Sequence, residues 1–178
     1  MHLSKEAFMK RIIFIAAALS LLGFNVNAMD RSGDAARATP QDVTDIQHVM
    51  DVFHHAVTTH DGDGVSRLFL DHGDTWATVL SDKAFAAARA KNPSAQKIRV
   101  SSYKDFASFV SGTKSNLDPR HTDVRIMSDG AIASVYFHFD FVIDGKSENR
   151  GDETWQLVKT TDGWRIVAII YSSNPGAA

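Results

Sequence analysis

The stretches DGAIASVYFHFDF (residues 129–141) and DETWQLVKTTDGWRIVAIIYSS (residues 152–173) decide the fold. In both, apolar and polar side chains alternate, which is the pattern of strands that bury one face. Asp-Gly pairs at 129–130, 144–145 and 162–163 separate the extended segments, and Asp-Gly between two strands is a strong hairpin signal. We therefore predict four consecutive antiparallel strands over residues 120–127, 131–143, 152–159 and 164–173.

The residues before these strands predict helices. Thr39 and Asp42 form a capping box around Pro40, and apolar residues then recur every three or four positions, which predicts a helix ending near Thr59. This apolar stripe consists of Val43, Ile46, Met50, Phe53 and Val57. Further helices are expected at 65–70, at 82–91 and from Ser102, and a first strand at 75–80. Helices followed by an antiparallel sheet predict an α+β domain with the helices packed on one face of the sheet.

The first 28 residues have the pattern of a signal peptide. Lys10 and Arg11 supply positive charge, residues 12–24 form an uncharged apolar run, and Ala28 ends a small-x-small motif that signal peptidase favours. The alternative is a membrane anchor, but this apolar run is shorter than the roughly 20 residues that a spanning helix needs. We therefore expect cleavage after Ala28, a periplasmic or extracellular protein, and no membrane contact afterwards. Met9 directly precedes Lys10, so Met1 and Met9 are both candidate starts.

Composition excludes several classes of function. The chain has no cysteine, which excludes disulfides, thiol catalysis and a lipid-modified cysteine. Without the predicted signal it has 16 basic and 20 acidic residues. The basic residues do not cluster, so neither nucleic acid nor an anionic membrane is an expected partner. The length suits a flexible leader over 29–38 and one domain over 39–174.

A family resemblance follows from the order of these elements. The HDGDG break at 60–64, LFLDHGDTWATVL at 68–80 and the closing DGWRIV hairpin together resemble the nuclear-transport-factor-2-like (NTF2-like) superfamily. The polyketide-cyclase-like and ketosteroid-isomerase-like branches are the most similar. The resemblance covers residues 39–173. It implies a cone-shaped, curved antiparallel sheet that wraps around N-terminal helices and leaves a pocket at its open end.

The resemblance also permits a test for steroid isomerisation, which needs a general base and two hydrogen-bond donors to an oxyanion. The tyrosine donor of the isomerase falls on Phe53, its base on Ala77 or Thr78, and its protonated aspartate on Gln156. None of these residues carries the required group. We therefore reject that activity.

The resemblance implies which side chains face the pocket of the cone. The ligand-binding residues predicted in this way are Phe53, His54, Trp76, Thr78, Val135, Phe137, Phe139, Thr154, Gln156, Ile169 and Tyr171. A mostly apolar lining with a few polar groups is typical of a small-molecule site. Two alternatives stay open: the cone holds an open pocket, or the aromatic side chains meet the helix and fill it as core.

Three other candidate features are weaker. His48, Asp51 and His55 have a spacing that suits a metal, but they lie opposite the apolar stripe and should face solvent, so we expect no metal and no cofactor. Residues 82–91 are expected to be an inserted helix that caps the mouth of the cone as a mobile lid. On the outer face of the sheet, Tyr136 and His138 could belong to an interface, a wet surface or a catalytic pair with Asp140.

The last strand predicts how the chain assembles. It is apolar on both faces, although a sheet that is covered on one side only should alternate. Its outward residues would be Trp164, Ile166, Ala168 and Ile170. We therefore expect a homodimer through the outer sheet face, with Trp155 and Trp164 among its anchors.

Two functions fit these observations. The first is an exported protein that binds a small apolar ligand or serves as a dimeric scaffold. The alternative is an isomerase, cyclase or hydrolase with a non-standard acid/base set such as His54, Tyr171 and Gln156. Ionisable groups inside the cavity and within reach of one another would favour the enzyme. A filled cone would favour a purely structural domain.

Overall fold

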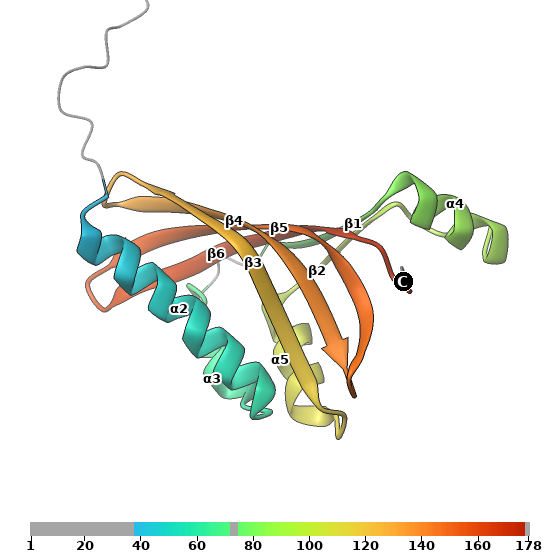
Figure 1. Ribbon diagram of the computed structural model, residues 1–178, viewed down its shortest axis with the longest axis horizontal. Coiled ribbons are helices and arrows are strands. Elements are labelled where there is room, and N and C mark those ends of the chain that lie inside the picture. The colour runs from blue at the N-terminus through green and yellow to red at the C-terminus, as the bar shows by residue number, and fades with distance from the viewer. Residues whose placement is uncertain (1–37, 72–74, 177–178) are drawn as a thin grey trace, which may run out of the picture. The chain divides into compact units, whose positions relative to one another are not determined.

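The computed structural model describes residues 38–71 and 75–176, which form helices and one six-stranded sheet (Figure 1). The predicted signal peptide and nearly all of the predicted leader lie outside these residues. The helices are α2 (Pro40–Thr58), α3 (Gly62–Arg67), α4 (Asp82–Lys91) and α5 (Tyr103–Gly112). The strands are β1 (Thr75–Leu80), β2 (Ile98–Ser101), β3 (Leu117–Ser128), β4 (Ile132–Ile143), β5 (Lys146–Thr160) and β6 (Gly163–Ser173). Within the described part of the chain, no helix is long and apolar enough to cross a membrane.

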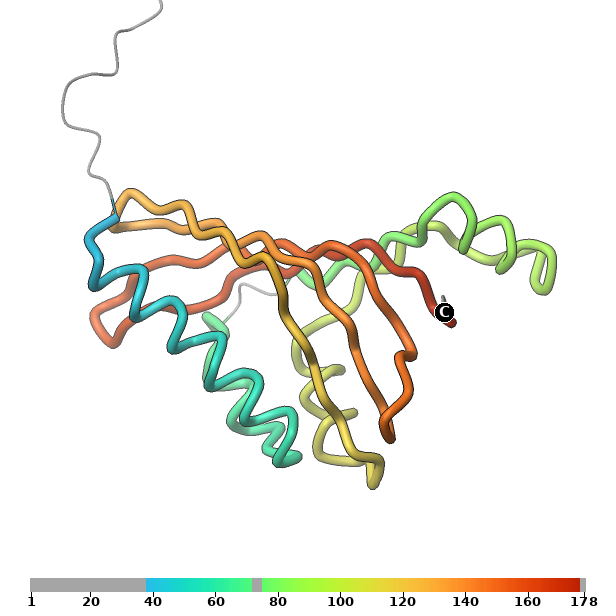
Figure 2. The backbone as a smooth tube through the Cα atoms, in the orientation of Figure 1, coloured from blue at the N-terminus to red at the C-terminus, as the bar shows by residue number. Residues whose placement is uncertain are grey.

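The strands lie in the order β2-β1-β6-β5-β4-β3. Strands β3 to β6 form the predicted antiparallel meander, which confirms the α+β class. Strand β1 instead pairs in parallel with β6, so the sheet is mixed rather than wholly antiparallel. The short strand β2, which the sequence pattern did not predict, adds an antiparallel edge beside β1. The sheet is strongly curved and does not close (Figure 2).

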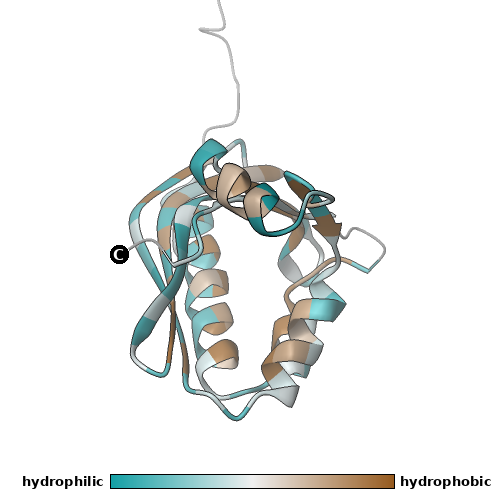
Figure 3. Cartoon of the chain, turned by 90° about the vertical axis from the view of Figure 1, so that its right-hand side faces the viewer, coloured by the Kyte–Doolittle hydropathy of each residue, from teal (hydrophilic) through white to brown (hydrophobic). Residues whose placement is uncertain are grey.

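Irregular pairing occurs at three places in the sheet. The register shifts between Thr122 and Arg125 of β3, between Phe141 and Val142 of β4, and between β5 and β6 after Gln156. An extra residue in one strand of a pair bends that strand and increases its twist. The three shifts therefore help to curve the sheet around α2, α3 and α5, which lie on its concave side (Figure 3).

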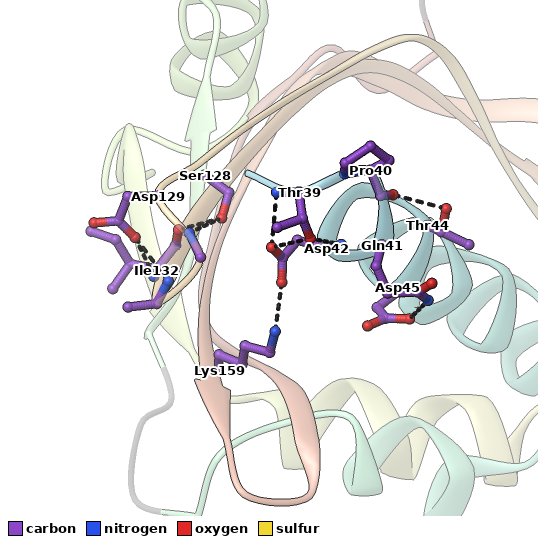
Figure 4. Close-up of polar contacts among 12 residues, drawn as sticks. Thr39, Pro40, Gln41, Asp42, Thr44, Asp45, Ser128, Asp129, Ile132 and Lys159 are labelled. Carbon is purple, nitrogen blue, oxygen red and sulfur yellow. Dashed lines mark hydrogen bonds and ion pairs between the residues drawn. The ribbon is translucent and has the colours of Figure 1, made fainter. Parts of the chain in front are cut away.

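Helix α2 begins at the predicted capping box. The Asp42 backbone N–H donates to the Thr39 hydroxyl at 3.1 Å, and the Asp42 carboxylate accepts from the Thr39 N–H at 3.0 Å and from its hydroxyl at 2.7 Å. The same carboxylate accepts from the ammonium of Lys159 on β5 at 2.6 Å (Figure 4). These bonds, that of Lys159 foremost, lower the pKa of Asp42 to about 2. One carboxylate thus both starts the helix and ties it to the end of the β5–β6 hairpin.

The core fills the part of the concave face under α2. Ile46 and Val57 of the predicted apolar stripe are fully buried, and the ring of Phe53 lies 5.0 Å from that of Trp155. Phe137 and Ile169 of the sheet are fully buried in the same cluster. His48, Asp51 and His55 are exposed on the opposite face of α2.

The predicted orientation of β5 is wrong. Thr154 and Gln156 were expected inside, but the fully buried side chains are Trp155 and Leu157. Gln156 is exposed and accepts a hydrogen bond from Ser134 on the outer face. Cross-strand partners share a face, and Trp155 pairs with the buried residues Val135 and Ile169. A shift of one residue moves every side chain of a strand to the other face, which explains the whole error.

The predicted orientation of β6 is half wrong. Ile169 and Tyr171 face inward as expected, but so do Trp164 and Ile166, which are 2% and 0% exposed. The cause is a bulge, because Gln156 pairs with Ala168 whereas Leu157 pairs with Ile166, so that Val167 has no partner on β5. The strand therefore changes parity and does not present two apolar faces.

The orientation of β5 and the bulge in β6 together remove the expected anchors of a homodimer. Trp155, Trp164 and Ile166 belong to the core and cannot contact a second copy. Apolar side chains do remain on the outer face, where Val100 of β2 is 69% and Ile170 of β6 is 44% exposed. The homodimer stays a prediction, with these residues in place of the tryptophans.

Candidate functional site

A cavity of about 440 Å³ opens at the end of the concave face that α2 does not fill. Strands β1 to β6 form its sheet side, and α2 and α5 contribute the rest. Its lining consists of Phe53, Trp76, Arg99, Ser101, Asp105, Phe106, Phe109, Pro119, His121, Phe139, Phe141, Asn149, Glu153 and Tyr171. A volume of this size suits a small molecule.

Aromatic rings form most of the wall. Helix α5 begins at a second capping box, in which Ser102 and Asp105 bond each other, and its next turns carry Phe106 and Phe109 to the cavity. Phe106 stacks on Trp76 at 4.8 Å between ring centroids and on Phe53 at 5.8 Å. The wall is therefore a continuous, close-packed aromatic surface rather than a set of isolated rings.

Glu153 supplies a carboxyl group on this aromatic wall. It pairs across the sheet with Phe137 and with Tyr171, which fixes its side chain on the concave face. The Trp155 indole N–H donates to its Oε1 at 2.5 Å. Burial raises the pKa of Glu153 to about 7, and the indole bond offsets this only in part. A carboxyl with such a pKa can hold or release a proton near neutral pH.

His121 provides a second ionisable group, and it is neutral. It pairs with Phe139 on the concave face, and its ring lies 4.4 Å from that of Phe137. Burial, with a smaller contribution from His54, lowers the pKa of His121 to about 4. A neutral imidazole can donate or accept a hydrogen bond but brings no positive charge to the cavity.

The remaining polar groups are few. The Thr78 hydroxyl donates to the Tyr171 hydroxyl at 2.7 Å, and Thr78 is itself buried behind the lining. Arg99 and Asp105 are exposed at the mouth. Hydrogen bonds from Ser102 lower the pKa of Asp105, so this carboxylate is ionised. The cavity therefore combines an apolar interior with a small polar rim.

No family model matches this sequence, and no curated protein matches it. Solved structures do. A protein of unknown function from Mycobacterium tuberculosis superposes with a TM-score of 0.56 at 15% identity, covering 78% of this chain and 78% of that one. An NTF2-like protein of unknown function from Shewanella baltica superposes with a TM-score of 0.54 at 16% identity, covering 78% of this chain and 99% of that one. A proposed dehydratase of the NTF2-like family from Streptomyces avermitilis superposes with a TM-score of 0.56 at 19% identity, covering 79% of this chain and 100% of that one.

This chain has the NTF2-like fold. At such low identity the likeness concerns the fold alone, because one fold carries many unrelated functions. The function therefore has to be argued from the cavity of this particular NTF2-like chain.

The predicted ligand-binding residues fall into four groups in the NTF2-like fold. Those that line the cavity are Phe53, Trp76, Phe139 and Tyr171. Thr78 lies directly behind it, hydrogen-bonded to Tyr171. Those fully buried in the core are Val135, Phe137 and Ile169. His54, Thr154 and Gln156 belong neither to the cavity lining nor to the buried core.

His54 lies on the far side of His121 from this cavity. Its Nδ1 is 2.9 Å from the Pro119 carbonyl oxygen, and with Asp51 it borders a second, more open hollow between α2 and β3. The predicted acid/base set of His54, Tyr171 and Gln156 is therefore wrong, because only Tyr171 reaches the cavity.

Sequence reasoning missed the two ionisable groups that matter most, Glu153 and His121. The signal for Glu153 was present, since the large apolar residues of DETWQLV are Trp155 and Leu157, and Glu153 shares their parity. For His121 the signal was weaker, because β3 is exposed over much of its length.

Two further expectations can be compared with the structure. Helix α4 forms at the predicted residues but has no buried residue and projects past the sheet (Figure 1), and none of its residues is among those that line the cavity. The prediction that residues 82–91 cap the mouth of the cone is therefore wrong. Among residues 38–71 and 75–176, no cluster of ligands suits a metal ion.

The outer-face histidine has a different partner from the one expected. His138 bonds Asp152, and its Nε2 lies 3.9 Å from Asp123, whereas Asp140 bonds Ser147. The cluster faces away from the cavity, so it contributes nothing to chemistry there.

We predict that Glu153 titrates near pH 7. A raised pKa means that the folded state loses stability as the pH rises from the ordinary value of 4.5 through 7, because the ionised form is poorly solvated. Glutamine cannot ionise, so the free energy of unfolding of Glu153→Gln minus that of the wild type should be larger at pH 8 than at pH 4.5. The expected difference between the two pH values is up to about 3 kcal/mol. Carbon NMR of labelled glutamate and urea unfolding at both pH values measure the two effects. A Glu153 pKa below 5 would contradict the assignment.

Proposed function

We propose that this chain binds a small molecule with a mostly apolar body in the cavity at the open end of its fold. The observation that carries the proposal is the aromatic cavity of about 440 Å³ with one desolvated carboxyl, that of Glu153, in its wall. Seven aromatic side chains line this one concave site. Their exposure to water is unfavourable, and a ligand with an apolar body would cover them. A few polar groups in such a lining usually orient a ligand.

The closed half of the concave face supports the same proposal. There the side chains from α2 and the sheet pack together in one buried cluster, so the fold is able to pack itself where packing is all that is needed. The cavity is confined to the half where Glu153 and His121 are found. An arrangement of this kind favours a binding site over an incompletely filled core.

The proposal extends to location and assembly. Export is supported by the charged and apolar pattern of residues 1–28. A second copy on the outer sheet face is supported by the exposed apolar side chains of Val100 and Ile170.

A ligand retained during purification tests the binding function. Protein isolated from its own host should carry a small molecule in native mass spectrometry. Replacing Ser101 with phenylalanine should remove it, because Ser101 lines the cavity and a larger side chain would occupy the space. The matched control is Ser134→Phe on the outer face, which should keep the ligand. Retention by Ser101→Phe, in a variant that melts like the wild type, would contradict the proposal.

A second candidate function is proton transfer, and the pKa of Glu153 favours it. A general base or acid is most effective when its pKa lies near the working pH. Glu153 satisfies this condition, and neutral His121 is a possible hydrogen-bond partner for an oxygen of the substrate. Two of the neighbouring structures have no known function and the third is a proposed dehydratase at 19% identity, so they support no particular reaction.

Deuterium uptake tests this candidate without knowledge of the substrate. An extract of host metabolites in D₂O should contain a compound that gains deuterium when the protein is added. The Glu153→Gln variant should slow the uptake by about 10²–10⁴-fold. Glu148→Gln, a change on the same strand outside the cavity, should leave it unchanged. Uptake that is equally fast with Glu153→Gln would exclude this role.

A further inference from the structure

Glu153 has no positively charged partner in the described part of the chain. It is absent from the ion pairs of that part, and its hydrogen bond comes from the neutral indole of Trp155. The buried carboxylate of Asp42, by contrast, is paired with the ammonium of Lys159. A desolvated carboxylate without a partner is unfavourable, so a cation that entered the cavity would stabilise it.

The surface around this carboxyl also favours a positive charge. The rings of Phe53, Trp76, Phe106, Phe109, Phe139, Phe141 and Tyr171 line the same cavity. The faces of aromatic rings carry a negative electrostatic potential, and they attract ammonium groups most strongly where water is excluded. Phe139 and Tyr171 meet edge to face at 5.6 Å beside the strand that carries Glu153.

Among residues 38–71 and 75–176, none of the groups that line the cavity forms an ion pair with Glu153. The ionisable groups that line the cavity with Glu153 are His121 of β3, Tyr171 of β6, Arg99 of β2 and Asp105 of α5. His121 is neutral near pH 7, and Tyr171 is hydrogen-bonded to Thr78. Arg99 is exposed at the mouth, where the ionised Asp105 lies as well. The interior therefore contains a negative charge whenever Glu153 is ionised.

We propose that the ligand is a small organic cation, an alkylated or aryl-bearing ammonium whose positive group lies against Glu153 and whose body packs on the aromatic wall. This inference rests on the binding function proposed above and specifies the chemistry of its ligand. The aromatic rings and the carboxylate would act together, since each attracts the same charge.

The proposal is tested with two probes of nearly equal shape. Phenyltrimethylammonium carries a positive charge, and tert-butylbenzene is its neutral isostere. Binding of each to the mature protein is measured at pH 8 by titration calorimetry or ligand-detected NMR. We expect the cation to bind at least about tenfold more tightly. Glu153→Gln should reduce this preference to the smaller part that the aromatic rings supply, whereas Glu148→Gln, the matched control on the same strand, should keep it in full.

The pH dependence provides a second readout. The cation prefers ionised Glu153, so its affinity should fall as the pH is lowered through 7, by up to about tenfold per pH unit. The affinity of the neutral probe should change little over this range.

Each outcome is decisive. If tert-butylbenzene binds more tightly, or if the preference for the cation is undiminished in Glu153→Gln, the proposed organic cation is overturned and the pocket stays in place. Binding of neither probe, with the wild-type protein folded, would overturn the pocket and this inference together.

Discussion

The pairing of β5 with β6 is the constraint on which the rest of the structure depends. Trp155 lies opposite Ile169, and the bulge at Val167 then brings Leu157 opposite Ile166. Without the extra residue, Ile166 and Trp164 would face outward and the core would lose two of its largest side chains. With it, all five of these apolar residues and Glu153 lie on one concave face. The bulge thus completes the core, while the pairing before it, of Glu153 with Tyr171, places the carboxyl on the cavity side.

The concave face is divided between stability and function. Helix α2 covers one half, anchored where Asp42 accepts hydrogen bonds from Thr39 and Lys159. Helix α5 borders the other half and contributes aromatic rings without filling it. Burial raises the pKa of Glu153 to about 7, because this residue stands where the packed core borders the cavity. A carboxyl in that position is unfavourable for stability, which is the usual sign of a functional group.

Much of the fold could be predicted from local patterns, whereas of the site only the aromatic residues Phe53, Trp76, Phe139 and Tyr171 could. Helix α2 with its capping box, helix α4, and the three Asp-Gly hairpins follow from residues close together in the chain. The bulge at Val167 does not, because the run IVAII is apolar at both parities and its phase depends on β5. The inward face of β5 was predictable in principle from Trp155 and Leu157, but the family resemblance was matched one residue out of phase. Cavity residues such as His121 and Arg99 meet only through the curvature of the sheet, which the sequence pattern does not specify.

The orientation of β5 is the most direct test of this account. The chain contains no cysteine, so a single introduced cysteine is its only thiol. Gln156→Cys and Leu157→Cys are compared for their rate of reaction with a bulky maleimide under native conditions, with circular dichroism to confirm folding. Because Leu157 is 1% exposed and Gln156 is exposed, the account predicts reaction at least about a hundredfold slower for the cysteine at 157. Rapid reaction at 157 together with protection at 156 would contradict it.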